Sequence, residues 1–94
     1  MRAYISGKIT DNSNYHTKFE EGEKHVNELG YEAINPAKLE NIMPADATHD
    51  DYMSVCLPLL SLADAIYMIP GWEKSKEACI EYGYAIAKGF TVLK

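Results

Sequence analysis

A serine and two glutamates follow one another at short spacing near the end of the chain: Ser75, Glu77 and Glu81. They come after residues 65–69, an apolar run that is short enough for a buried strand and is closed by a Pro-Gly pair. Ser75 can cap a helix that runs to about residue 88, with Glu77 in its first turn, where the helix dipole favours an anion. A strand, a glycine turn and a helix N-terminus leave free backbone N–H groups for an anionic ligand. This pattern suits a sugar phosphate held beside an acidic nucleophile, a role that Glu81 could fill.

The elements that would position these residues begin with a strand over residues 2–6, which is rich in β-formers and closed by a glycine. A helix over residues 15–29 follows, and Gly30 stands where a helix is expected to stop. Residues 31–34 form the next strand, which ends at an Asn-Pro pair. The order strand, helix, strand predicts the βαβ unit of a parallel sheet.

The second half of the chain continues the alternation. The segment that begins at Thr48 has capping-box spacing and starts a helix, which is followed by the strand at residues 65–69, the helix from Ser75 and a last strand over residues 91–93. The expected architecture is a single α/β domain over residues 1–94, with about four parallel strands in the order 2-1-3-4 and helices on both faces. Ligands bind such sheets at the carboxyl ends of the strands, so the loops after the first three strands should form the site.

Charge and hydropathy exclude several classes of protein. The net charge is −5 and there is no basic run, which disfavours a nucleic acid polymer as partner. Asp64 and Pro70 interrupt the longest apolar run, so no membrane segment is expected, and the start of the chain does not have the pattern of a secretion signal. Cys56 and Cys79 both fall on predicted inward helix faces, which is typical of reduced, buried thiols in a cytoplasmic protein.

The three histidines, His16, His25 and His49, are too scattered for a metal site, and no Cys–His spacing supports zinc. Neither a metal nor a cofactor is therefore expected. A four-stranded sheet in so short a chain leaves apolar helix surface that a second copy could cover, which predicts a homodimer or a larger homo-oligomer. The candidates for that surface are Tyr52, Leu59 and Tyr82.

Several segments, taken in order, are similar to those of a known family: Tyr4-Ile-Ser-Gly7, Asn35-Pro36, Ala63-Asp-Ala65 and Pro70-Gly-Trp-Glu-Lys-Ser75, with Glu81 after them. They resemble the nucleoside 2-deoxyribosyltransferase superfamily, most closely its small phage and bacterial branch, over essentially the whole chain. The resemblance implies a flavodoxin-like three-layer sandwich, in agreement with the parallel sheet expected above. It also implies chemistry at the N-glycosidic bond of deoxynucleosides or their monophosphates.

The resemblance implies roles for single residues as well. Glu81 falls where the family carries its nucleophile, and Tyr4 falls where the family has a tyrosine that orients that glutamate. Ser75 and the Gly7 loop fall where nucleotide-hydrolysing members hold the 5′-phosphate. The substrate contacts expected on this basis are Ser6, Gly7, Lys8, Asn35, Pro36, Cys56, Gly71, Trp72 and Ser75.

Two positions depart from the family's pattern. Cys56 stands where members usually have an aspartate that acts on the leaving base, and a buried thiol is a poorer proton donor than a carboxylic acid. Glu77 stands where many relatives have a glycine in the phosphate-facing turn. A carboxylate there would repel a phosphate unless it points away.

The sequence leaves structural alternatives open. Glu81 could be a helix glutamate on a solvated flank, Tyr4 a packed strand tyrosine, and Trp72 either a base-stacking ring or a cover for the helix start. Three functions remain: an enzyme that forms a covalent glycosyl-glutamate resolved by a base or by water, a nucleotide-binding module that has lost catalysis, and an interaction protein without a small ligand. The presence of Glu81 together with Tyr4 favours the enzyme over the binding module.

Overall fold

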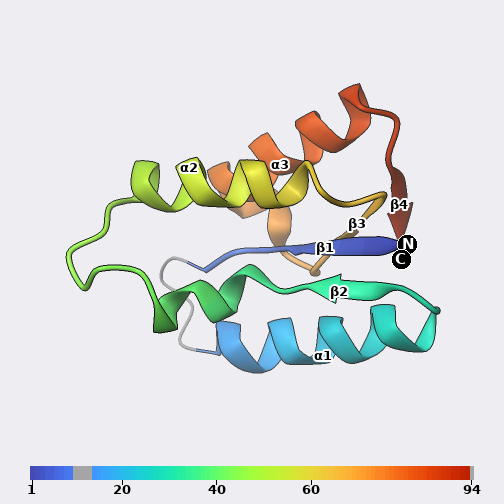
Figure 1. The fold of residues 1–94 in the computed structure, drawn as a ribbon, viewed down its shortest axis with the longest axis horizontal. Coiled ribbons are helices and arrows are strands. Elements are labelled where there is room, and N and C mark those ends of the chain that lie inside the picture. The colour runs from blue at the N-terminus through green and yellow to red at the C-terminus, as the bar shows by residue number, and fades with distance from the viewer. Residues whose placement is uncertain (10–13, 94) are drawn as a thin grey trace.

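The computed structural model describes residues 1–9 and 14–93 (Figure 1). The strands are β1 (Arg2–Ser6), β2 (Glu32–Ile34), β3 (Ala65–Met68) and β4 (Thr91–Leu93). The α-helices are α1 (Tyr15–Glu28), α2 (His49–Leu60) and α3 (Lys76–Ala87), and the short 3₁₀ helices are η1 (Pro36–Asn41) and η2 (Trp72–Lys74). No helix of these residues is both long and apolar enough to cross a membrane.

The strands form one parallel sheet in the order β2-β1-β3-β4, which confirms the predicted order and direction. β1 lies in the middle, with Tyr4 opposite Ile34 of β2 on one side and Ile66 of β3 on the other. The strand order reverses between β1 and β3. In open α/β sheets the carboxyl end of the strands at such a reversal is where ligands bind.

Helices cover both faces of the sheet, so the molecule has three layers (Figure 1). Side chains alternate along β1, with Ala3 and Ile5 packed toward α1 and Tyr4 packed toward α2 and α3. One core cluster contains Ala3, Ile5, Phe19, Val26, Ala37, Ala65 and Ile69, and the other contains Tyr4, Leu39, Cys56, Leu60, Ala63, Ile66 and Ala85. The fold is a flavodoxin-like α/β sandwich, as predicted.

Local sequence decides where α2 and α3 begin. Thr48 Oγ1 accepts a hydrogen bond from the backbone N–H of Asp51 at 3.2 Å, and Asp51 Oδ2 accepts one from the N–H of Thr48 at 2.8 Å, which is a complete capping box. Ser75 Oγ accepts from the N–H of Ala78 at 3.2 Å and caps α3. Both predicted caps are confirmed.

The prediction for one of the two cysteines is wrong. Cys56 is buried as expected, whereas Cys79 is exposed, and both thiols are free. The buried stripe of α3 consists of Ala78, Glu81 and Ala85. Cys79 lies one residue beyond Ala78 and is therefore turned about 100° around the helix, away from the sheet.

Candidate functional site

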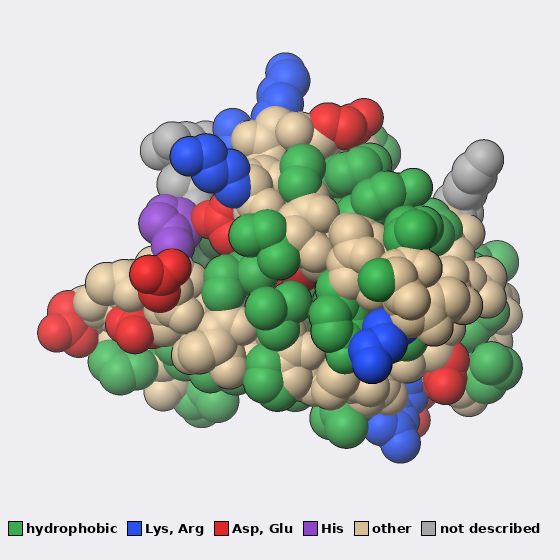
Figure 2. All heavy atoms as spheres, turned by 90° about the horizontal axis from the view of Figure 1, so that it is seen from above, with side chains coloured by type: hydrophobic (Ala, Val, Ile, Leu, Met, Phe, Trp, Pro, Cys, Tyr) green, Lys and Arg blue, Asp and Glu red, His purple; other side chains and the backbone are tan. Residues whose placement is uncertain are grey.

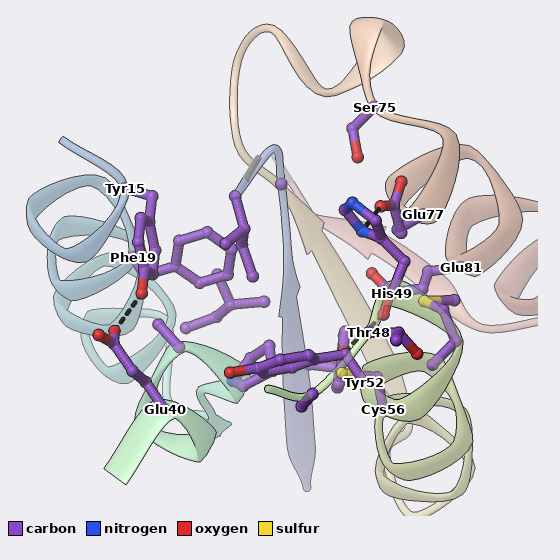
Figure 3. Close-up of a pocket in the computed structure, with 18 residues that line it drawn as sticks. Tyr15, Phe19, Glu40, Thr48, His49, Tyr52, Cys56, Ser75, Glu77 and Glu81 are labelled. Atoms are coloured by element: carbon purple, nitrogen blue, oxygen red, sulfur yellow. Dashed lines mark hydrogen bonds and ion pairs between the residues drawn. The ribbon is translucent and has the colours of Figure 1, made fainter. Parts of the chain in front are cut away.

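A cavity of about 450 Å³ opens at the carboxyl end of β1, between α1 on one side and the first turns of α2 and α3 on the other (Figure 3). Its volume lies within the range of about 300–1,000 Å³ that is typical of small-molecule sites. The cavity lies at the strand ends where the loops were expected to form a site. Its lining comprises Tyr4, Ile5, Gly7, Ile9, Tyr15, Phe19, Pro36, Ala37, Glu40, Ala47, Thr48, His49, Tyr52, Met53, Cys56, Ser75, Glu77 and Glu81.

The wall of the cavity holds a buried carboxylate, that of Glu81, which is only 5% exposed. The hydroxyl of Tyr4 donates to its Oε2 at 2.6 Å, and the hydroxyl of Ser6 donates to its Oε1 at 2.6 Å. Tyr4 and Ser6 are two residues apart in β1, so their side chains leave the same face of the sheet and meet α3. The alternative of a solvated helix flank for Glu81 is therefore wrong.

Burial and hydrogen bonding act in opposite directions on this carboxylate. Burial raises the pKa of Glu81, the hydrogen bonds from Ser6 and Tyr4 oppose the rise, and the negative charge of Glu77 adds to it. Burial, followed by the charge of Glu81, raises the pKa of Tyr4 well above its ordinary value of 10.0. The phenol therefore keeps its proton and remains a hydrogen-bond donor to Glu81 at neutral pH.

Glu81→Gln should stabilise the folded chain at neutral pH. Because the folded-state pKa of Glu81 lies above its ordinary value of 4.5, protonation of Glu81 contributes stability that is fully present below that value and is lost as the pH rises through the folded-state pKa. Glutamine carries no charge to bury, so we expect the free energy of unfolding to rise by about 0.5–2 kcal/mol near pH 7, the usual gain from a single stabilising substitution.

Thermal unfolding of wild type and variant between about pH 4 and pH 8 measures this difference, which should shrink toward the acid end. Glu73→Gln is the control, because Glu73 is exposed and its loss changes the net charge equally. A Glu81→Gln variant that is no more stable than wild type at neutral pH would contradict the expectation.

Cys56 lies on α2, lines the cavity and is 5% exposed. Burial raises the pKa of the Cys56 thiol, contact with the Tyr4 hydroxyl opposes the rise, and the charge of Glu81 adds to it. The thiol is therefore neutral at neutral pH and is a weak proton donor.

Glu77 and His49 meet across the mouth of the cavity, one from the first turn of α3 and the other from the first turn of α2 (Figure 3). Glu77 Oε1 lies 2.6 Å from His49 Nδ1, and the side chain of Glu77 is 30% exposed. Both residues line the cavity, and the carboxylate of Glu77 is turned toward the His49 ring (Figure 3).

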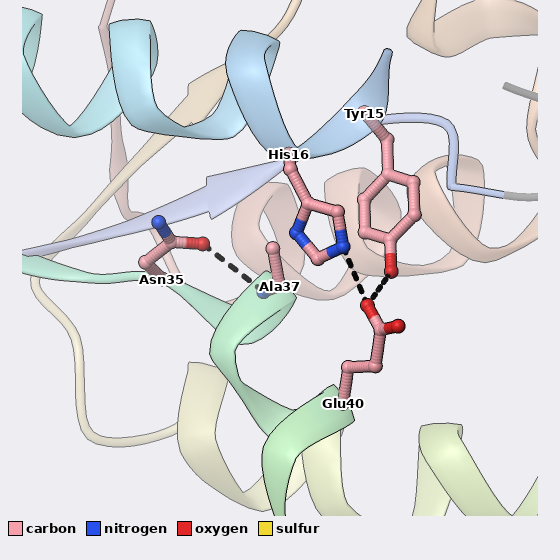
Figure 4. A network of polar contacts seen from close by, with 5 residues as sticks. All are labelled: Tyr15, His16, Asn35, Ala37 and Glu40. Carbon is pink, nitrogen blue, oxygen red and sulfur yellow. Dashed lines mark hydrogen bonds and ion pairs between the residues drawn. The ribbon is translucent and has the colours of Figure 1, made fainter. Parts of the chain in front are cut away.

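At the opposite end of the cavity, Glu40 of η1 meets the first two residues of α1 (Figure 4). The hydroxyl of Tyr15 donates to Glu40 Oε2, and His16 Nε2 contacts the same oxygen. Burial, with the contact to Glu40, raises the pKa of Tyr15 to about 12, while the hydrogen bond from Tyr15 is the main cause that lowers the pKa of Glu40. Across residues 1–9 and 14–93, no group of three or more His, Cys, Asp and Glu side chains could hold a metal ion.

Several predicted contacts lie away from the cavity wall. Trp72 stacks on Tyr82 with ring centroids 4.8 Å apart, which fits the alternative in which it covers the start of α3. Asn35 caps η1, its Oδ1 accepting from the N–H of Ala37 at 3.0 Å (Figure 4).

Ser6 touches Glu81 but does not line the cavity. The predicted contacts that do not line it are Ser6, Lys8, Asn35, Gly71 and Trp72, and those that do are Gly7, Pro36, Cys56 and Ser75. Residues 10–13 of the predicted Gly7 loop lie outside the described residues.

The sequence did not identify several aromatic side chains and one glutamate that line the cavity. Tyr52 was expected only as apolar surface and no ligand contact was expected for Tyr15 or Phe19, yet all three line the cavity. The rule that ligands bind at the carboxyl ends of strands could have identified Tyr15 and Tyr52, which lie in the first turns of α1 and α2. Glu40 lies in a 3₁₀ helix whose sequence has no periodic signal, so only the fold reveals its position.

A family model described as "Domain of unknown function (DUF4406)" matches residues 1–94. The chain belongs to the DUF4406 family. No curated protein and no solved structure matches it. The cavity and the polar groups on its wall are what this DUF4406 domain offers for chemistry.

Proposed function

We propose that this DUF4406 domain cleaves or transfers the N-glycosidic bond of a deoxynucleoside or its monophosphate. The observation that carries the proposal is the buried carboxylate of Glu81, which Tyr4 and Ser6 hold through both oxygens at the wall of the cavity. A carboxylate nucleophile needs a fixed position and an ionised state near neutral pH, and the two donors favour both. The resemblance to the nucleoside 2-deoxyribosyltransferase superfamily supports the same role for Glu81.

In the proposed first step, an oxygen of Glu81 bonds to C1′ of the sugar while the C1′–N bond breaks through an oxocarbenium-like transition state. The electron pair of the broken bond stays on the base nitrogen, which takes a proton from water or a neighbouring donor. In the second step, water or the N–H of another base attacks C1′ and gives its proton to solvent or to the group that protonated the leaving base, while the bond between C1′ and Glu81 breaks to restore the carboxylate. Water as acceptor makes the domain a hydrolase, and a second base makes it a transferase.

The rest of the cavity suits a planar base. Tyr15 stands beside Glu40 at one end of the cavity, and the rings of Phe19 and Tyr52 lie between that end and Glu81 (Figure 3). Aromatic rings stack on nucleobases at about 1–3 kcal/mol per base, without regard to base identity. A base that leaves from C1′ at Glu81 would therefore have an apolar surface to occupy.

The test of the proposal is direct. The protein is incubated with a panel of deoxynucleosides and their 5′-monophosphates, with and without a second free base, and free base and new nucleosides are separated by chromatography. Release of base with at least one substrate supports the proposal. No release with any substrate would count against it.

Cys56→Asp should raise the rate on purine substrates if protonation of the leaving base limits turnover. Cys56 is a neutral thiol beside Glu81, and an aspartate would supply the acid that related sequences usually have there. We expect an increase of about 10²-fold, at the low end of the effect of general acid catalysis. Cys79→Asp is the matched control, because Cys79 is exposed on α3. An unchanged or lower rate in Cys56→Asp would show that leaving-group protonation is not limiting.

The same thiol favours a second candidate function. Without a strong acid beside the leaving group, the domain could bind nucleosides without cleaving them, as a binding module of the same fold. Calorimetric titration with the same panel distinguishes the two candidates. Binding with no base release would favour the module.

We also propose that the domain forms a homodimer or larger homo-oligomer in a reducing, cytoplasmic setting. Hydrophobic side chains gather over α2 and α3 (Figure 2), and on α3 the side chains of Ile80 and Ile86 are 53% and 51% exposed. Apolar surface of this kind commonly marks an interface. Light scattering should give a mass of at least two chains, and Ile80→Glu should lower it. A monomeric mass for wild type would contradict the assembly.

A further inference from the structure

The charge of the cavity is unfavourable for a phosphorylated ligand. The acidic and basic side chains on its wall are three glutamates, Glu40, Glu77 and Glu81, and one histidine, His49. Among the residues that the structure describes, no lysine or arginine lines it, and residues 10–13 are Thr-Asp-Asn-Ser, which contain no basic residue. Proteins usually hold phosphates with arginine, lysine or the free N–H groups of a helix start.

The helix start that could hold a phosphate, that of α3, already carries an anionic side chain, the carboxylate of Glu77. Glu77 lies in the first turn of α3, where the free N–H groups and the helix dipole favour negative charge. Its carboxylate also lies 2.6 Å from Nδ1 of His49, which lines the cavity as well. A phosphate entering here would have to displace Glu77 from His49 and remain near its charge.

We propose that the ligand is a nucleoside with a free 5′-hydroxyl group, and that Glu77 rejects the 5′-phosphorylated form. This inference rests on the proposed function and narrows its substrate class. Glu77 and Glu81 are four residues apart on α3 and both line the cavity. Side chains at this spacing lie on one helix face with Cβ atoms about 5–6 Å apart, a separation that a pentose and its 5′ carbon can span.

The two forms of the ligand interact with Glu77 in opposite ways. A 5′-hydroxyl can donate a hydrogen bond to the carboxylate. A 5′-phosphate has no donor when fully ionised, and it carries about −1.5 to −2 charges at neutral pH. Repulsion at a few ångströms near a protein surface is large enough to separate the two affinities by about 10–100-fold at moderate ionic strength.

One competing arrangement must be tested at the same time. If Glu77 turned aside, His49 could face the phosphate and bind it, and Ser75, which caps α3 and lines the cavity, could contribute. In that arrangement the 5′-monophosphate would be the preferred ligand, and His49→Gln would weaken its binding.

The experiment compares a deoxynucleoside with its own 5′-monophosphate, using the best base found in the panel. Base release is measured for wild type, Glu77→Gln, His49→Gln and the control Glu73→Gln, which removes an exposed charge outside the cavity. Binding of both ligands is measured by calorimetry on Glu81→Gln, alone and combined with Glu77→Gln, so that the comparison does not depend on turnover. Any effect of Glu77 on the nucleophile Glu81 changes the rates of base release from both substrates by the same factor, so it cancels in the ratio of the two rates.

We expect wild type to prefer the nucleoside by about 10–100-fold and Glu77→Gln to move the ratio toward the monophosphate by about tenfold, with no change in Glu73→Gln. A monophosphate preference in wild type, a ratio that Glu77→Gln does not move, or monophosphate binding that depends on His49 would overturn the inference while the proposed function stands. If neither ligand is cleaved or bound, the proposed function fails, and the inference fails with it.

Discussion

Replacing Glu81 by glutamine should reduce base release by about 10³-fold or more, because the amide keeps the shape of the side chain and removes the attacking charge. Tyr4 and Ser6 can still hydrogen-bond to the amide, so the cavity wall and ligand binding should change little. The measurement is the rate of base release together with the dissociation constant of the same nucleoside. A lost rate with retained binding is the expected pattern.

Glu40→Gln is the informative comparison for this variant. It removes a lining carboxylate from the other end of the cavity, beyond the aromatic rings. Loss of that charge should affect affinity more than the rate of bond cleavage. Equal rates in wild type and Glu81→Gln would end the assignment of Glu81 as nucleophile.

Tyr4→Phe should lower base release at neutral pH by about 10–100-fold, a smaller loss than that of Glu81→Gln. The phenol hydroxyl donates to Glu81 Oε2 at 2.6 Å, and this hydrogen bond is one of the two that oppose the effect of burial on the pKa of Glu81. Without it, that pKa should rise further. The acid limb of the pH–rate profile should therefore move to higher pH, with part of the lost rate recovered in alkaline solution.

The shift of the pH–rate profile distinguishes a role of Tyr4 in orienting Glu81 and keeping it ionised from a role in packing alone. Tyr84→Phe is the matched control, because Tyr84 is partly buried on α3 against the ring of Phe90 and does not line the cavity. Ser6→Ala removes the other donor, at 2.6 Å from Oε1, and should shift the profile in the same direction. A lower rate in Tyr4→Phe with an unmoved acid limb would show that Tyr4 only packs.

Most of the fold could be predicted from sequence because its signals are local. The capping box at Thr48, the cap at Ser75 and the glycine after α1 mark helix ends through hydrogen bonds and dihedral angles within a few residues. The alternation of strands and helices then leaves few allowed topologies, and the parallel order 2-1-3-4 is one of them. The error at Cys79 arose because periodicity identifies a buried stripe but leaves its exact width undecided.

The sequence by itself determined that a carboxylate, a capping serine and a strand tyrosine would lie near one edge of a parallel sheet. Only the tertiary structure decided which groups share the cavity, because side chains from distant segments meet through packing that no local pattern encodes. It joined Glu81 to Tyr4 and Ser6, more than seventy residues away in the chain, set His49 against Glu77, and added Glu40 to the far wall. It also turned Trp72 of η2 onto Tyr82, because a ring in a tight turn packs on the nearest apolar surface, here that of the next helix, α3.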